Sequence, residues 1–258
     1  MENGNNLGNK APASAPKKKP KIVAIVAASD FNEKHFMSSV KGGMFASVIA
    51  ADAGYRHLDT RAFVPNIVIG DFDSLGYVPK EDKIASIQLK EDADAGAPKN
   101  MRVMQYPEDK DKSDLELAID EALSMKPQII MLYGALGRRL DMIISSIQML
   151  SHIADHRVGV FCVGDKDACV VVNGPSEFGL GIPQDAEIDK RVSIFSLTDV
   201  SLVETSQGLK WPYTNTAITN SMSLGVSNEI VGNPMKLKVK MGKILVVFSA
   251  ELLGPKKE

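Results

Sequence analysis

Two aspartates follow a short apolar run in the first half of the chain. The segment IVIGDFDSLG, residues 67–76, predicts a buried β-strand that ends at Gly70 and leads directly into Asp71 and Asp73. Open parallel sheets bind their ligands beyond the carboxyl ends of the strands. Carboxylate oxygens suit Mg²⁺, which commonly takes one or two of them together with substrate phosphates. The segment therefore predicts a magnesium site, with Phe72 packed underneath it.

Other carboxylates follow the neighbouring apolar runs. If those runs are parallel strands, their carboxylates meet at one edge of the sheet and repel one another unless a cation lies among them. Arg138 and Arg139 stand in the glycine-containing stretch GALGRRLD, and arginines are suited to binding phosphate beside a metal. The pattern predicts phosphoryl-type transfer from a metal–nucleotide complex. The further carboxylates are those of Asp52, Asp111, Asp114 and Asp141.

The elements that must position these side chains alternate between strand and helix. Apolar β-branched runs occur in KIVAIVAAS, SVIAAD, PNIVIGD, RVMQYP, QIIMLYGA and GVFCVG. Between them, Ser113 can cap a helix that begins in SDLELAIDEAL, and residues 140–155 have a second helical pattern. Strands that alternate with helices predict a Rossmann-like α/β domain with a parallel sheet.

The pattern changes after about residue 169. Short apolar runs separated by turn residues follow, without a helix-length period, and predict an antiparallel β-sandwich or barrel. KLKVKMGKILVVF predicts a β-hairpin that turns at Met241–Gly242. We therefore expect a disordered basic leader over residues 1–20, an α/β domain with the nucleotide and metal site over residues 21–168, and a β domain over residues 169–254.

Composition excludes several classes of protein. The net charge is −2 and aromatic residues make up 6%, so a nucleic-acid partner is not expected. Apolar runs fall short of the roughly 18 residues that span a bilayer, and a membrane partner is not expected either. Cys162 and Cys169 lie in apolar runs without zinc-type spacing and do not require an oxidising compartment. We expect a cytoplasmic protein.

Four motifs, in this order, carry a resemblance to a known family. GDFDSL, DKDKSDLELAI, GALGRRLD and TSQGLKWPYTNTAITNSMSLGVSNEIVG together resemble the motifs of thiamine pyrophosphokinase over roughly residues 22–249. The resemblance implies a transferase that moves the pyrophosphoryl group of ATP to thiamine and yields thiamine diphosphate and AMP. It also implies Mg²⁺, ATP as co-substrate, and a homodimer with its active sites at the interface. On this resemblance, residues 21–168 form the catalytic domain and the β domain over residues 169–254 binds thiamine and dimerises.

The same resemblance assigns roles to individual residues. The metal-binding residues are Asp71, Asp73 and Asp114, and Asp52 joins them as a catalytic residue. Among the nucleotide-binding residues, Ser113 and Asp141 match family motifs. We also assign nucleotide binding to Ser74, Asp111, Arg138 and Arg139. The thiamine-binding residues are Trp211, Ser227 and Asn228. The chain departs from the family pattern at Ala53, where ADAG replaces ADGG, and at Met142, where a polar residue is usual.

Two alternatives stay open. IVIGDFDS has the strand-then-DxDxS shape of a haloacid-dehalogenase-type phosphatase, in which Asp71 would be the nucleophile. That family places its nucleophile after the first strand of the domain, whereas at least two predicted strands precede Asp71 here. A non-catalytic thiamine-binding relative is the second alternative, and the departures at Ala53 and Met142 are its support.

Overall fold

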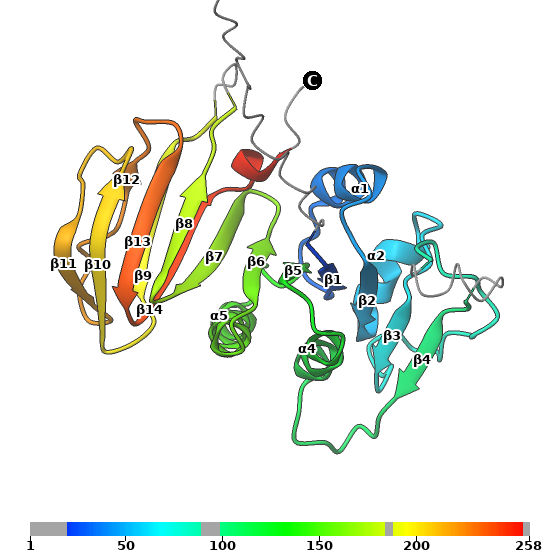
Figure 1. Ribbon diagram of the computed structural model, residues 1–258. Coiled ribbons are helices and arrows are strands. Elements are labelled where there is room, and N and C mark those ends of the chain that lie inside the picture. Colours follow the sequence, from blue (N-terminus) through cyan, green and yellow to red (C-terminus); the bar gives the residue numbers. More distant parts are fainter. Residues whose placement is uncertain (1–19, 89–98, 184–187, 255–258) are drawn as a thin grey trace, which may run out of the picture.

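A long sheet organises the molecule. The computed structural model describes residues 20–88, 99–183 and 188–254, so most of the predicted leader lies outside the described residues. Six parallel strands form one half of the sheet in the order β6-β5-β1-β2-β3-β4 (Figure 1). They are β1 (Ile22–Val26), β2 (Ser47–Ala51), β3 (Ile67–Gly70), β4 (Arg102–Gln105), β5 (Ile129–Tyr133) and β6 (Gly159–Val163).

Helices cover both faces of the central parallel strands, in agreement with the continuous apolar runs of β1, β2, β3 and β5. On one face, α1 (Glu33–Lys41) and α2 (Tyr55–Asp59) pack on Ala24 and Val26, and a short 3₁₀ turn, η1 (Asp52–Gly54), precedes α2. On the other face, α4 (Asp114–Ser124) and α5 (Leu140–Asp155) pack on Val23 and Ile25. Figure 1 shows α1 and α4 on opposite sides of the sheet.

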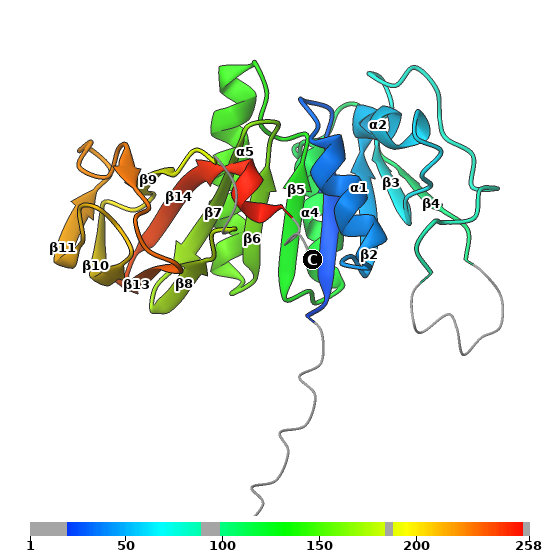
Figure 2. The ribbon, with the colours of Figure 1, turned by 90° about the horizontal axis from the view of Figure 1, so that it is seen from above.

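Antiparallel strands extend the same sheet and add a second one. β7 pairs antiparallel with β6, and the ten-stranded order is β12-β9-β14-β7-β6-β5-β1-β2-β3-β4. A four-stranded sheet, β11-β10-β13-β8, packs over its antiparallel half, as Figure 2 also shows. The strands are β7 (Asp167–Asn173), β8 (Ser176–Leu180), β9 (Arg191–Ser196), β10 (Val200–Gln207), β11 (Thr214–Thr219), β12 (Asn228–Glu229), β13 (Met235–Met241) and β14 (Lys243–Ser249), followed by the 3₁₀ turn η2 (Ala250–Leu253).

The predicted fold class, an α/β domain followed by an antiparallel β-sandwich, is confirmed. The predicted boundary near residue 169 falls within β7, which is hydrogen-bonded to β6 on one side and to β14 on the other. The sheet is thus continuous between the two halves, and the exact domain limits stay a prediction. No helix within the described ranges is long and apolar enough to cross a membrane.

The predicted hairpin at Met241–Gly242 is wrong. β13 pairs with β10 and β8 in the four-stranded sheet, whereas β14 pairs with β7 and β9 in the long sheet. Gly242, with φ at 81°, takes the chain from one sheet to the other. The apolar faces of both strands belong to one core cluster that includes Leu237 and Val246. The two strands are therefore packed against each other across the core and are not paired side by side in one sheet.

Candidate active site at the carboxyl edge of the parallel strands

Three carboxylates meet where β2 and β3 end. Asp52 follows β2, Asp71 and Asp73 follow β3, and one carboxylate oxygen from each lies within 4.8 Å of the others. Asp52 is only 8% exposed, and its buried Oδ1 makes no hydrogen bond within the described parts of the chain. Three like charges and a buried oxygen without a donor are costly unless a cation completes the group. This all-oxygen donor set therefore fits Mg²⁺.

The backbone at this edge takes unusual conformations. Asp52 and Phe72 both have positive φ, 42° and 66°. A positive φ is costly for a bulky residue, and such outliers concentrate at functional sites. Phe72 is 3% exposed and belongs to the core, so the prediction that it is packed inside the protein is confirmed. Gly70 allows the close approach, because a Cβ there would lie 3.0 Å from the Cβ of Asp52.

Asp114 joins the group through a lysine. Asp114 begins α4, whose N-cap Ser113 accepts a hydrogen bond from the Glu116 N–H at 3.2 Å. Lys110, in the loop before α4, donates through Nζ to Asp71 Oδ2, and the same Nζ lies 3.1 Å from Asp114 Oδ1. The hydrogen bond from Lys110 lowers the pKa of Asp71, while burial raises the pKa of Asp114.

Lys110 was not predicted from the sequence. Its side chain is 13% exposed, which is unusual for a lysine without a role in the core or in a site. The only local signal is that it precedes Asp114 by four residues, and Lys112 precedes Glu116 in the same way. Sequence spacing therefore could not distinguish the lysine of the site from the surface lysine.

A second residue that sequence reasoning missed is Arg56 in α2. Its Nη2 donates to the backbone oxygens of Ser74 at 2.6 Å and Leu75 at 3.0 Å. The loop that carries Asp71 and Asp73 is thereby attached to the helix that follows Asp52. Ser74 also donates from Oγ to Asp73 Oδ1 at 2.9 Å. These contacts fix the positions of the carboxylates relative to one another.

The other predicted nucleotide residues lie in the loop before α4 and around the start of α5. Asp111 is exposed in the loop before α4. Arg139 pairs with Asp141 at 2.7 Å, and both side chains are exposed where α5 begins. Arg138 and Arg139 follow β5, next to β1, where the strand order reverses. This is the position at which open α/β sheets bind their ligands.

The two departures from the family pattern cause no strain at this edge. Ala53 is not among the described non-glycine residues with positive φ; its neighbour Asp52 is. Alanine at this position therefore does not have to adopt a conformation that favours glycine. Met142 is 45% exposed near the start of α5.

The predicted thiamine residues form a second group. Trp211 is 57% exposed, and Lys210 Nζ lies 5.0 Å from the centre of its ring. Asn228 is 3% exposed, and its amide accepts from the Trp211 N–H at 3.2 Å and donates to the Trp211 carbonyl at 2.8 Å. Ser227 is exposed, with φ at 59°. Asn228 therefore positions the backbone of Trp211 and leaves the indole and Ser227 exposed to a ligand.

The two groups lie far apart in one chain. Asn228 belongs to β12 at one edge of the long sheet, and Asp71 follows β3, eight strand spacings away. At about 4.8 Å per spacing, the separation along the sheet is about 38 Å. Figures 1 and 2 both place β11 and β4 at opposite ends of the molecule. The carboxylate group and the predicted thiamine residues, which we call the two half-sites, therefore do not lie in one site within a single chain.

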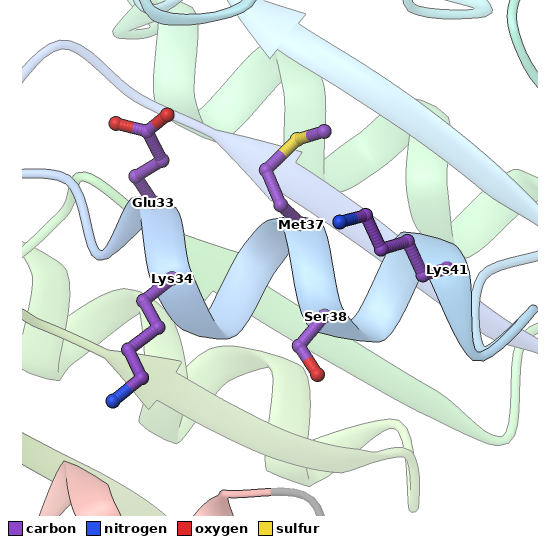
Figure 3. A pocket seen from close by; sticks show the side chains of 5 residues that line it. All are labelled: Glu33, Lys34, Met37, Ser38 and Lys41. Atoms are coloured by element: carbon purple, nitrogen blue, oxygen red, sulfur yellow. The ribbon is translucent and has the colours of Figure 1, made fainter.

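A hollow adjoins the carboxylates, and another lies on α1. One, of 530 Å³, runs beside the aspartates between the loops that follow β3 and β4; it is lined by Asp71, Phe72, Asp73, Gly76, Tyr77, Val78, Gln105, Tyr106, Pro107 and Glu108. The other, of 690 Å³, lies on the outer side of α1. Figure 3 shows Lys34 and Lys41 of that hollow projecting from α1. The hollow beside Asp71 is the one that adjoins the candidate site.

Comparison with known proteins gives matches over both halves of the chain. A family model described as thiamin pyrophosphokinase, catalytic domain, matches residues 45–162. A second, described as thiamin pyrophosphokinase, vitamin B1 binding domain, matches residues 179–244. The first range contains the carboxylate group and Lys110, and the second contains Trp211 and Asn228.

Individual relatives are similar over most of their length. The curated thiamine pyrophosphokinase of Bacillus subtilis is 26% identical over 203 residues, which cover 79% of this chain and 87% of that protein. The crystal structure of the Bacillus subtilis enzyme superimposes with a TM-score of 0.69 at 24% identity, covering 89% of this chain and 99% of that one. The Geobacillus thermodenitrificans enzyme gives 0.67 at 26% identity, covering 88% and 97%.

Proposed function

The chain belongs to the thiamin pyrophosphokinase family, and we propose that it transfers the pyrophosphoryl group of ATP to thiamine in a Mg²⁺-dependent reaction that yields thiamine diphosphate and AMP. The observation that carries the proposal is the group of Asp52, Asp71 and Asp73, whose oxygens lie within 4.8 Å of one another. Its position at the carboxyl edge of a parallel sheet is where a nucleotide is expected.

Asp71, Asp73 and Asp114 would hold the metal ion, and Asp52 completes the group. When bound, Mg²⁺ neutralises negative charge on the phosphates of ATP. The fit rests on the all-oxygen donor set and on the buried Oδ1 of Asp52, which lacks a hydrogen-bond donor among the described residues.

The chain's own residues supply positioning, charge and a proton acceptor. Arg138 and Arg139, which follow β5 at the reversal of strand order, would bind phosphate oxygens. The hydroxyl of thiamine attacks the β-phosphorus directly, AMP leaves, and an aspartate of the carboxylate group accepts the hydroxyl proton. We propose no covalent intermediate, so orientation and charge neutralisation account for most of the rate.

We further propose that the active enzyme is a homodimer in which each site combines two chains. Trp211 stacks on thiamine bound by one subunit, and the carboxylates of the other subunit hold the nucleotide. The separation of about 38 Å along the sheet, at about 4.8 Å per strand, supports this arrangement, because a single chain cannot bring both groups to one thiamine. A cytoplasmic location stays a prediction.

AMP release from ATP and Mg²⁺, with and without thiamine, tests the proposal. The wild type should release AMP only with thiamine, and Asp73→Asn should reduce that rate by about 10²- to 10³-fold, since it removes one charge from the metal-binding group. Asp199→Asn, in the turn between β9 and β10, is a matched control and should keep the wild-type rate.

Other outcomes would favour the alternatives. Phosphate release without thiamine would indicate a phosphatase that uses Asp71, although Asp71 follows a strand next to the sheet edge and its Oδ2 is bonded to Lys110. Saturable thiamine binding without AMP release would indicate a non-catalytic relative.

A further inference from the structure

Lys110 lies among the carboxylates of the candidate site and is one of the least exposed lysines that the structure describes. Its Nζ donates to Asp71 Oδ2 and lies 3.1 Å from Asp114 Oδ1. The exposed fractions of the three side chains are 13% for Lys110, 12% for Asp71 and 22% for Asp114. Both partners are among the residues that would hold the metal.

The charges around Lys110 do not balance. Asp52, Asp71, Asp73 and Asp114 supply four negative charges against the single positive charge of the lysine. The ammonium lowers the repulsion among the carboxylates but leaves an excess that attracts a divalent cation. It also occupies Oδ2 of Asp71, one of the two oxygens that this carboxylate can offer to a metal.

We propose that Lys110 is an exchangeable counter-ion. Before the metal binds, its ammonium group holds the carboxylates together through its hydrogen bond to Asp71. When the metal binds, Lys110 leaves Asp71 and contacts the phosphates of the nucleotide. The proposal rests on the proposed function for the identity of the nucleotide. A lysine is suited to this exchange because its side chain is long and flexible and its charge is compact. The loop that carries it connects β4 to α4, so the ammonium can move without a change in the sheet.

The proposed exchange predicts changes in metal and nucleotide affinity that a purely structural ion pair would not cause. Removing a competing positive charge should tighten metal binding, whereas removing a phosphate contact should weaken nucleotide binding. A lysine that only supports the fold of the loop would weaken both when it is replaced. The two affinities therefore change in opposite directions only if Lys110 is exchanged.

The test uses Lys110→Met and Lys110→Gln in the full chain. Glutamine removes the charge but can still donate hydrogen bonds to both aspartates, so it keeps the test valid if the methionine variant does not fold. Mn²⁺ binding without nucleotide is measured from the signal of free Mn²⁺ in electron paramagnetic resonance, with Mg²⁺ as competitor. Binding of a methylene analogue of ATP with an uncleavable α–β bridge is measured by calorimetry in excess Mg²⁺.

Lys112 provides the matched control. It lies in the same loop, but it is 47% exposed and pairs with Glu116 at 3.6 Å and Asp120 at 2.5 Å on the outside of α4. Lys112→Met removes the same charge two residues away from Lys110. It should leave both affinities within about twofold of the wild type, since exposed pairs contribute little.

We expect Mn²⁺ to bind about three- to tenfold more tightly to the folded Lys110 variants and the ATP analogue to bind about tenfold more weakly. Weaker or unchanged Mn²⁺ binding would overturn the exchange, and unchanged binding of the analogue would overturn the phosphate contact. Failure of the proposed function is seen separately, as a wild type that releases no AMP with thiamine, and it does not affect the Mn²⁺ measurement.

Discussion

Replacing Asp52 with asparagine should stabilise the metal-free protein while it impairs the site. The carboxylate oxygens of Asp52, Asp71 and Asp73 lie within 4.8 Å of one another. At an effective dielectric constant of about 20, each pair of charges at that distance repels by about 3.5 kcal/mol. Exposure of Asp73 and the ion pair between Asp71 and Lys110 reduce the net relief to about 1–2 kcal/mol.

The expected shift in melting temperature follows from that figure. For a chain of this size, 1 kcal/mol corresponds to about 2–4 °C, so Asp52→Asn should raise the melting temperature in EDTA by about 2–8 °C. Asparagine tolerates the positive φ of 42° at this position, so the substitution adds no backbone strain. Excess MgCl₂ should raise the melting temperature of the wild type, and that increase should be largely lost in the variant.

Scanning calorimetry of both proteins in EDTA and in MgCl₂ measures these shifts. Asp59→Asn is the control, because Asp59 has its own partner in Lys83 at 2.8 Å and should gain nothing when its charge is removed. A lower melting temperature of Asp52→Asn in EDTA would refute the argument that repulsion dominates at this edge. An undiminished stabilisation by Mg²⁺ would refute the assignment of Asp52 to the metal-binding group.

Three further predictions concern other parts of the chain. Arg56→Ala removes the contacts between the loop after β3 and α2. It should weaken Mn²⁺ binding about tenfold at a nearly unchanged melting temperature, since these contacts only orient the carboxylates. A variant with the Mn²⁺ affinity of the wild type would contradict this role. Trp211→Ala should raise the KM for thiamine about tenfold without loss of stability, because the indole is 57% exposed. Asn228→Ala should raise the KM as well, and it should also lower the free energy of unfolding in urea by about 1–3 kcal/mol, since it removes a buried amide. Burial lowers the pKa of His35, so the unfolded chain binds more protons; the stabilisation should be complete above about pH 6.5 and be lost as the pH falls toward the lower folded pKa. Denaturant unfolding at several pH values should show a free energy of unfolding that falls with decreasing pH in the wild type, and His35→Gln should remove this dependence. An unchanged pH dependence in the variant would mean that another group is responsible.

Much of the candidate site could be predicted because its signals are local. The aspartates stand directly after apolar runs, and the predicted strands and the helix over residues 140–155 agree with the elements of the structure. Since parallel strands end at a common edge, the grouping of Asp52 with Asp71 and Asp73 follows from the strand order alone. The N-cap role of Ser113 is local in the same sense.

Other features depended on which segments meet in space. The turn at Gly242 has the local pattern of a hairpin, but the two strands belong to different sheets, because their apolar faces are buried against each other. Asn228 belongs to a motif expected to contact thiamine, and only the fold shows that its amide is bonded to the backbone of Trp211.

The sequence by itself determined the fold class, the family and the residue types of the site, because strand and helix periods and turn motifs are properties of neighbouring residues. The tertiary structure decided that Lys110, and not Lys112, joins the carboxylates, and that the two half-sites of one chain lie at opposite ends of the sheet. Burial and distance cause both results, and each depends on packing between segments that are remote along the chain.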